Sequence, residues 1–394
     1  MISFEEKHLT NVRESDVLWL GRIMSLEIVQ YKPMRFILNI IAVSIIALTL
    51  IQTYLFLQKF DGLYLIKYAS VYTASLFILF SIIAAPFLTK FSTEALNNLE
   101  YWPIESAGAQ IEKQIQREAI YINTFFVVNM VVSLISGVAH MIPLDDDKEL
   151  FYPLAIFEEF APKWKNWLEW GYRLSFLVVP VVMLNSSYVG IYTLSNFRFQ
   201  ISLFNHLLKN INFPLNDNEQ TIELMDDQKY QNEINKRLKF CIKRQTHLYK
   251  VAHYVTGKVK HLSFFVAILT ILLLIAVIVF LFSFQGTFEN RYFRIITLVL
   301  TAGNTFIHVI IMGNRIEEET EKIFENLKSL NWSSWNLQNR QVYLIFLHNN
   351  EEHFKVPISE NASVNYELGI SMAKTICSMV SVMSQLKNID YSKN

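Results

Sequence analysis

Residues 364–386 read V-N-Y-E-L-G-I-S-M-A-K-T-I-C-S-M-V-S-V-M-S-Q-L, and this stretch decides the expected fold class. It is long enough to cross a bilayer as a helix, because about 20 residues at about 1.5 Å each span the hydrocarbon core. Its polar side chains recur at steps of three and four residues and share one helical face, the polar stripe: Ser371, Lys374, Ser378, Ser381 and Gln385.

A polar stripe inside a membrane must face protein or water, because unpaired polar groups in lipid are costly. One interpretation is a pore-lining helix that this chain contributes to an oligomer. The other is that the serines allow close helix packing within a single bundle. The spacing alone favours neither.

Long uncharged runs recur between residues 36 and 313, in a chain of 394 residues that is 52% hydrophobic and 18% charged. This pattern predicts an all-α protein with several membrane-spanning helices. Besides the polar-stripe helix, the predicted spans cover residues 34–57, 65–88, 119–142, 172–197, 262–284 and 292–313, and Pro180 is expected to break the fourth.

The polar segments between these spans divide the chain and set its orientation. Most of the 35 Lys and Arg residues fall in the N-terminus and in the second, fourth and sixth links. Cytoplasmic loops are enriched in these residues, so we expect seven spans with a cytoplasmic N-terminus and an extracellular C-terminus. The expected regions are a cytoplasmic segment 1–33, four spans in 34–197, a cytoplasmic helical link 198–260, two spans in 261–313, a cytoplasmic anchor region 314–360, the polar-stripe helix 361–387 and an extracellular tail 388–394.

Two of the cytoplasmic segments are expected to fold together. In a helix over residues 230–260, the apolar residues Ile234, Leu238, Cys241 or Ile242, and Leu248 lie near one side, and a second helix is expected over residues 315–328. Their opposite charges favour docking of one on the other, but apolar packing must carry the assembly, because exposed ion pairs contribute under about 1 kcal/mol each. The alternative is two solvated helices that do not meet.

The loop 143–171 contains Trp164, Trp167 and Trp170. Indole side chains suit the membrane–water boundary, having one apolar side and one hydrated side. Capture of a ligand is the alternative role for these tryptophans.

Several classes of function lack sequence support. The chain contains no P-loop, zinc-protease or nucleophile-elbow motif, so no enzymatic activity is expected. His140 and His308 have no second ligand nearby in sequence, so neither a metal nor another cofactor is expected. A net charge of zero argues against binding to nucleic acid. No carboxylate lies in the middle of the first six spans, which disfavours an ion-coupled carrier.

The C-terminal pattern resembles that of the insect odorant receptor family. The residues that carry the resemblance are Trp335, Arg340, Pro357, the run Lys374-Thr375-Ile376-Cys377-Ser378-Met379-Val380-Ser381 and the ending Gln385-Leu386-Lys387. Cys377 and Met379 stand where the family usually has tyrosines. The motif covers about the last 55 residues, and the seven-span topology covers the whole chain.

The resemblance implies an odorant-gated, nonselective cation channel in the plasma membrane of a sensory neuron. Such a channel is a heterotetramer whose central pore is lined by the last helix. Val382 and Gln385 match the family's gate spacing, and Ser378, Ser381 and Lys374 line the path above it. The family's co-receptor carries a long insertion after the fourth span, and link 198–260 is too short to contain it. The chain therefore resembles the variable, odorant-binding subunit.

The family's ligand, a small apolar volatile, binds in the outer half of the bundle between spans two, three, four and six. Residues at that depth are Tyr72, Leu76, Ser136, His140, Phe176, Met183, Ile296, Leu300 and Thr301. The affinity is expected to come mainly from buried apolar area, at about 25 cal/mol per Å², with one or two polar contacts that set the orientation.

Two other receptor classes also have seven spans. A G-protein-coupled receptor would have Asp-Arg-Tyr and Asn-Pro-x-x-Tyr motifs, which do not occur here, and the opposite orientation. A gustatory-type receptor channel would end in a Thr-Tyr and Gln-Phe signature, which also does not occur. A scaffolding subunit without a ligand of its own is a further alternative.

Overall fold

The computed structural model describes residues 16–58, 62–144, 147–212, 221–283, 289–359 and 362–391. This part of the chain is helical apart from loops and one isolated bridge between Pro357 and Ser363. The long helices are α3 (Lys32–Gln58), α4 (Gly62–Asn98), α5 (Ala109–Met141), α9 (Val179–Lys209), α11 (Gln228–Ser283), α12 (Glu289–Lys328) and α14 (Tyr366–Tyr391). The shorter elements are α1 (Trp19–Arg22), a π-helical turn (Ile23–Glu27), α2 (Ile28–Gln30), a 3-10 helix (Ile104–Ala107), α6 (Asp147–Leu150), α7 (Tyr152–Phe160), α8 (Lys165–Ser175), α10 (Thr221–Asp226) and α13 (Leu337–His348).

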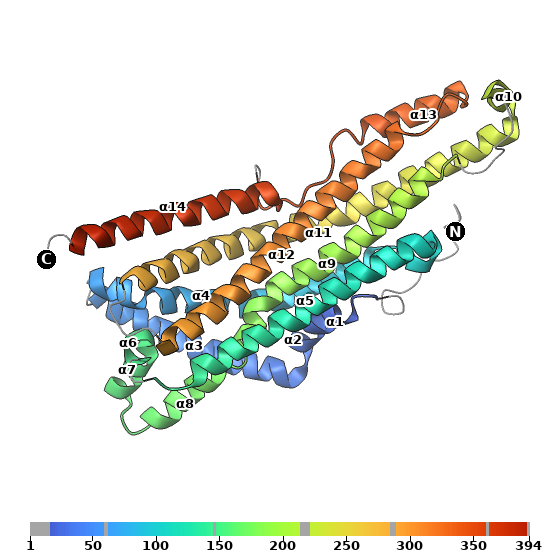
Figure 1. Ribbon diagram of the computed structural model, residues 1–394. Coiled ribbons are helices and arrows are strands. Elements are labelled where there is room, and N and C mark those ends of the chain that lie inside the picture. The colour runs from blue at the N-terminus through green and yellow to red at the C-terminus, as the bar shows by residue number, and fades with distance from the viewer. Residues whose placement is uncertain are drawn as a thin grey trace.

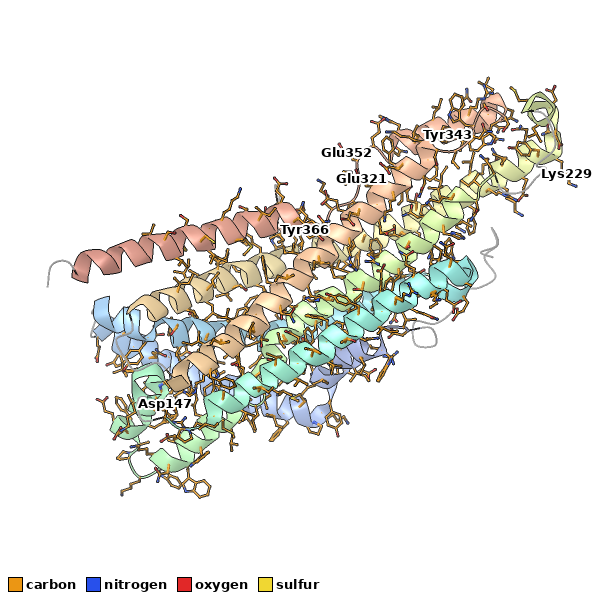
Figure 2. The ribbon with its side chains drawn as sticks, viewed as in Figure 1. Asp147, Lys229, Glu321, Tyr343, Glu352 and Tyr366 are labelled. Carbon is orange, nitrogen blue, oxygen red and sulfur yellow. The ribbon has the colours of Figure 1, made fainter. Side chains whose placement is uncertain are left out.

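The helices form one elongated bundle (Figure 1). The short helices α6, α7 and α8 gather at one end, and α10 and α13 lie at the opposite end. Figure 2 marks these two ends with Asp147 and Tyr343. Helix α14 runs along the outside of the bundle, where it contacts α11 and α12.

Six helical segments of the described residues are long and apolar enough to cross a membrane. They are Lys32–Gln58, Ser70–Asn98, Ala109–Met141, Lys165–Lys209, Gln228–Ile278 and Phe293–Lys328. The helix predicted over residues 364–386 is present as α14, with 26 residues, but it is not among these six. Its hydrophilic side chains make it less apolar than the others. The predicted count of seven spans is therefore not confirmed by this criterion, and both the count and the orientation stay predictions.

Helix boundaries differ from hydropathy boundaries. Helix α11 continues without a break through residue 260, where the sequence suggested a change from a cytoplasmic link to a span. Hydropathy indicates whether a stretch of helix lies in lipid or in water, and it does not mark where the helix ends. A helix can continue from one into the other because Lys, Gln and Leu are all good helix formers. The break predicted at Pro180 is present: α8 ends at Ser175, and α9 begins at Val179 with the proline in its first turn, where no amide hydrogen bond is lost.

Helix α9 is the centre of the bundle. It packs against α4, α5 and α12, and side chains on several of its faces are fully buried, including Tyr188, Tyr192, Leu203 and Phe204. A helix that is apolar on all sides can be stable only when other helices surround it.

The predicted apolar face of residues 230–260 is confirmed. Ile234, Leu238, Cys241 and Leu248 are fully buried and belong to the main hydrophobic cluster, together with residues of α12 and α13 such as Ile323 and Tyr343. The predicted direct docking on residues 315–328 takes another form. Helix α11 packs on α13 and α9, and both of these helices also contact α12. Apolar area rather than opposite charge joins the segments.

Candidate functional site

An aromatic cluster lies at the end of the bundle near α6, α7 and α8. We define it as His140 of α5, Phe151 and Phe157 at α7, Tyr172 of α8 and Phe176 just after α8. Ring centroids are 5.1 Å apart for Tyr172 and Phe176, 5.4 Å for Phe151 and Phe176, and 5.8 Å for His140 and Phe176. Tilted and edge-on arrangements at these separations are favourable, and they hold the rings together as a largely apolar cluster.

His140 supplies one polar group of this cluster. Its Nδ1–H donates a hydrogen bond of 2.7 Å to the carbonyl of Ser136, one helical turn earlier. This bond fixes the ring and leaves Nε2 as the nitrogen able to meet a second partner. A single oriented polar group among aromatic rings suits a small ligand with one hydrogen-bonding group.

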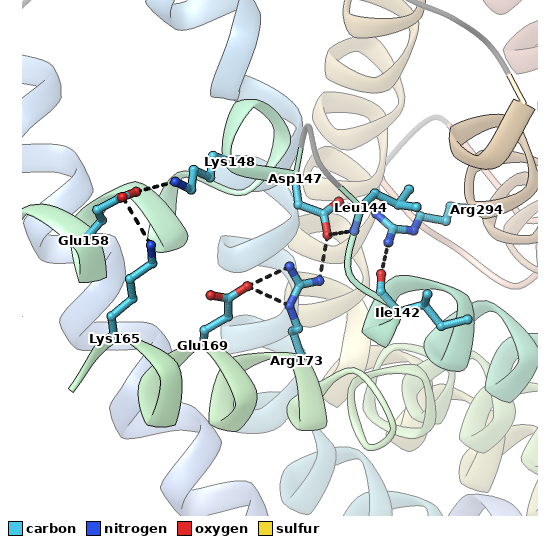
Figure 3. A network of polar contacts seen from close by, with 9 residues as sticks. All are labelled: Ile142, Leu144, Asp147, Lys148, Glu158, Lys165, Glu169, Arg173 and Arg294. Atoms are coloured by element: carbon cyan, nitrogen blue, oxygen red, sulfur yellow. Dashed lines mark hydrogen bonds and ion pairs between the residues drawn. The ribbon is translucent and has the colours of Figure 1, made fainter. Parts of the chain in front are cut away.

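A buried ion-pair network lies beside the aromatic cluster, within reach of Phe151. Figure 3 shows this network. Asp147, at the start of α6, accepts from Nη1 of Arg173 at 2.7 Å and from Nη1 of Arg294 at 2.6 Å. All three side chains are 3–4% exposed. Glu169 pairs with Arg173 at 2.9 Å, and the Arg294 guanidinium lies 6.0 Å from the Phe151 ring centroid. Asp147 therefore joins α6, α8 and α12.

The other Arg294 contacts attach α12 to the end of α5. Its Nε donates to the carbonyl of Ala139 at 2.8 Å, and its Nη2 donates to the carbonyl of Ile142. The Leu144 amide donates to Asp147 at 2.9 Å. Buried charges persist only when such hydrogen bonds satisfy them, so this network holds the end of α5 and the starts of α6 and α12 together beside the aromatic cluster.

A second set of charges in this loop is exposed. Hydrogen bonds from Lys148 and Lys165 lower the pKa of the Glu158 carboxyl below its usual range. Exposed ion pairs add little to stability, so the contacts of Glu158 with Lys148 and Lys165 are expected to stabilise the protein much less than the buried Asp147 network does. Trp164, Trp167 and Trp170 are also exposed, and their predicted place at the membrane boundary stays a prediction.

The structure brings some of the predicted ligand residues together and separates others. Ser136, His140 and Phe176 meet at the aromatic cluster. Tyr72 forms a 3.0 Å hydrogen bond with Thr53, and Val71 beside it packs on the cluster. The remaining interior residues are Leu76, which is half-buried on α4, Met183, which packs in a cluster around Ile41 and Val179, and Thr301, whose hydroxyl donates to the Thr297 carbonyl at 2.8 Å.

Two predicted residues do not face the interior. Ile296 and Leu300 are 52% and 58% exposed on the outer face of α12. The depth of a residue along a span fixes its height and not its direction, so the sequence did not reveal that these two side chains point outward. The outward direction was visible only once the neighbours of α12 were known.

Sequence reasoning missed Phe151, Tyr172 and the buried network. A signal for the network existed, since Arg173 and Arg294 are charges placed within predicted spans, and such charges must find partners. Their shared partner, Asp147, precedes both arginines in sequence inside an acidic loop, and only folding brings the three together.

A close contact joins α12 to the start of α14. A Cβ atom built on Gly313 would lie 2.1 Å from the carbonyl oxygen of Val364 and 2.7 Å from the Val364 side chain. Gly369 packs similarly near Ile310 of α12. The side-chain amide of Asn365 donates a hydrogen bond from Nδ2 to Oε2 of Glu317 at 3.2 Å. We call this contact the α12–α14 joint.

The polar stripe of α14 faces away from the rest of the protomer. Ser371, Lys374, Ser378 and Ser381 are exposed, and Val382 is 52% exposed. Met372, Ile376 and Met379, on another face, are half-buried. The side chain of Gln385 lies outside the described part of the structure. Within a single protomer, the described part of the stripe is therefore not packed against other helices.

The fold, an elongated helical bundle with six candidate membrane spans among the described residues, is that of a multi-pass membrane protein. A family model described as 7tm Odorant receptor matches residues 94–386. The chain belongs to the odorant receptor family.

Solved structures agree with this assignment at the level of the fold. The olfactory receptor OR5 of the insect Machilis hrabei aligns with a TM-score of 0.68 at 8% identity, covering 94% of this chain and 97% of that chain. The structure of OR5 in complex with eugenol aligns with a TM-score of 0.64 at 10% identity and the same coverage. Comparison with curated protein sequences finds no match.

Proposed function

We propose that this chain is the odorant-binding subunit of an odorant-gated, nonselective cation channel, a heterotetramer with a co-receptor subunit in the plasma membrane of a sensory neuron. The observation that carries the proposal is the unpartnered polar stripe of α14. Exposed serines and a lysine on a helix that borders lipid are unfavourable unless water or another subunit covers them. A central aqueous pore lined by α14 from several subunits supplies that cover.

The ligand site of this proposal is the aromatic cluster with its neighbours Ser136 and Tyr72. An apolar volatile gains affinity there from buried area, and His140 offers one hydrogen bond. Ile296 and Leu300 are left out of the site because they face away from it.

Helix α12 connects the ligand site to the proposed pore helix. Arg294 is held by the network beside the aromatic cluster, and Gly313 is part of the α12–α14 joint. The 19 residues between them rise about 28 Å along one continuous helix. A ligand that favours a different position of the Arg294 end shifts the joint by moving this helix as a unit, and binding opens the pore only if it favours the open arrangement.

The experiment that tests the function is current recorded from cells that express this chain with a co-receptor. A broad panel of volatiles, which includes eugenol because the similar OR5 fold holds it, is expected to evoke current only when this chain is present. Phe176→Ala is expected to weaken the response about tenfold or more, because it removes a half-buried ring that contacts His140, Phe151 and Tyr172 and with it apolar area that a ligand would cover. Ile296→Ala is the matched control and should respond as wild type. Equal responses of Phe176→Ala and wild type to every active volatile would remove the aromatic cluster as the ligand site.

The pore assignment has a separate test. Val382→Ala and Gln385→Ala are expected to change rectification or the preference among cations, because their side chains border the proposed narrow part of the conduction path. Val380→Ala, at an exposed position of α14 on the side away from the stripe, should leave both properties unchanged. If Val382→Ala and Gln385→Ala both leave conduction, rectification and ion preference unaffected, these two residues do not line the gate.

A further inference from the structure

A cavity of about 470 Å³ lies among α2, α3 and α4, away from the aromatic cluster. Its walls contain the cationic side chains of Arg35 and Lys90, the polar side chains of Asn39 and Thr93, and the carboxylate of Glu94. A volume of this size is within the range of small-ligand sites. The cavity among α2, α3 and α4 plays no part in the proposed odorant response.

Thr89 is an unexplained polar group in the wall of this cavity. The residue is 1% exposed, and its hydroxyl has no hydrogen-bond partner among the described residues. A buried hydroxyl without a partner is unfavourable, so its presence points to a bound group that accepts or donates a hydrogen bond there.

The charges of the cavity favour an anion. Oε1 of Glu94 lies 3.9 Å from Nζ of Lys90, so this carboxylate neutralises the lysine in part. Oε2 of Glu94 also accepts a hydrogen bond of 3.4 Å from the Tyr254 hydroxyl of α11. Arg35 has no ion-pair partner within the described residues. The guanidinium group matches the planar pairs of oxygens that a phosphate presents.

The surface beside the cavity is apolar. Phe36, Ile40 and Val43 of α3 and Ile83 and Phe87 of α4 are exposed on the helices that form its walls. The cavity lies at the first turn of α3 and in the later half of α4, where these candidate membrane spans meet their polar ends. A polar, cationic cavity that opens beside an apolar surface matches an amphiphile, with its head group in the cavity and its chains along the helices.

From these observations we infer that the cavity binds the phosphate head group of an anionic phospholipid, with Arg35 and Lys90 on the phosphate oxygens and Thr89 as a hydrogen-bond donor. The acyl chains lie along the exposed apolar faces of α3 and α4. The lipid connects α2 and the start of α3 to α4. The inference does not depend on the proposed channel function, because the binding can be measured without current.

Native mass spectrometry of the full chain purified in detergent tests the inference. Phosphatidylglycerol is expected to remain bound to the wild-type chain, and phosphatidylcholine is expected to bind more weakly. The double variant Arg35→Gln, Lys90→Gln should retain phosphatidylglycerol about tenfold less, since each charge-assisted contact contributes on this scale. Lys113→Gln, an exposed charge removal at the start of α5, is the matched control and should bind as wild type.

A second variant separates the site from general surface charge. Thr89→Val keeps the shape of the side chain and the charge of the protein, and it should also reduce phosphatidylglycerol retention. Equal retention by wild type and all variants would overturn the inference. Inorganic phosphate that binds as tightly as the lipid would overturn the assignment to a phospholipid, because the acyl chains would then contribute nothing.

Discussion

Gly313→Ala is expected to lower the odorant-evoked current of the co-expressed channel at least about tenfold, at unchanged surface expression. The new Cβ atom would lie 2.1 Å from the carbonyl oxygen of Val364, which is backbone and cannot rotate away. Overpacking of this kind typically costs about 1–3 kcal/mol. The start of α14 must therefore move away from α12, which separates the helix that carries Arg294 from the proposed pore helix.

The same helix supplies the matched control. Gly303 is also in α12, and a Cβ atom placed there meets nothing within 4 Å. Gly303→Ala should leave the current unchanged and should stabilise the helix by about 1 kcal/mol, because alanine is the better helix former. A normal current in Gly313→Ala would show that the α12–α14 joint does not transmit ligand binding.

Asp147→Asn is expected to produce the largest loss of stability. The substitution keeps the size of the side chain and removes its charge, so Arg173 and Arg294 remain buried without a counter-ion. Breaking a buried ion pair by removing one partner typically costs about 3–5 kcal/mol. We expect a clearly lower thermal stability of the purified protein, measured by the fraction that stays monodisperse after heating.

Glu158→Gln is the comparison variant, because Glu158 forms ion pairs with Lys148 and Lys165 at the exposed surface of the same loop. Solvent screens such pairs, and their loss should leave the thermal stability nearly unchanged. If the two variants lose stability to the same small extent, the Asp147 network is not the anchor of the loop.

The Gly313→Ala and Asp147→Asn variants test contacts that the sequence did not reveal. Hydropathy located the apolar segments, since each needs only its own composition to be recognised. The spacing of polar residues within one segment likewise predicted the polar stripe of α14, because helical spacing is a local property. The predicted face of Ile234, Leu238 and Cys241 was correct for the same reason: these residues repeat on one side of a single helix.

The directions of side chains on α12 could not be obtained in this way. This helix is apolar on several sides within the span, so the sequence does not distinguish the face of Thr301 and Thr305 from the face of Ile296 and Leu300. The helices that pack on α12 decide which face becomes interior. The same holds for Gly313, whose importance comes from a backbone carbonyl 51 residues later in the chain.

The sequence by itself determined that the chain is a helical membrane protein, that its last helix is amphipathic, and that its C-terminal motif resembles odorant receptors. These properties depend on composition and on spacing within single segments. Only the tertiary structure decided which residues form the aromatic cluster, that Asp147 joins Arg173 to Arg294, and where α12 meets α14. These properties depend on the packing of segments distant in sequence, which the pattern of any one segment does not contain.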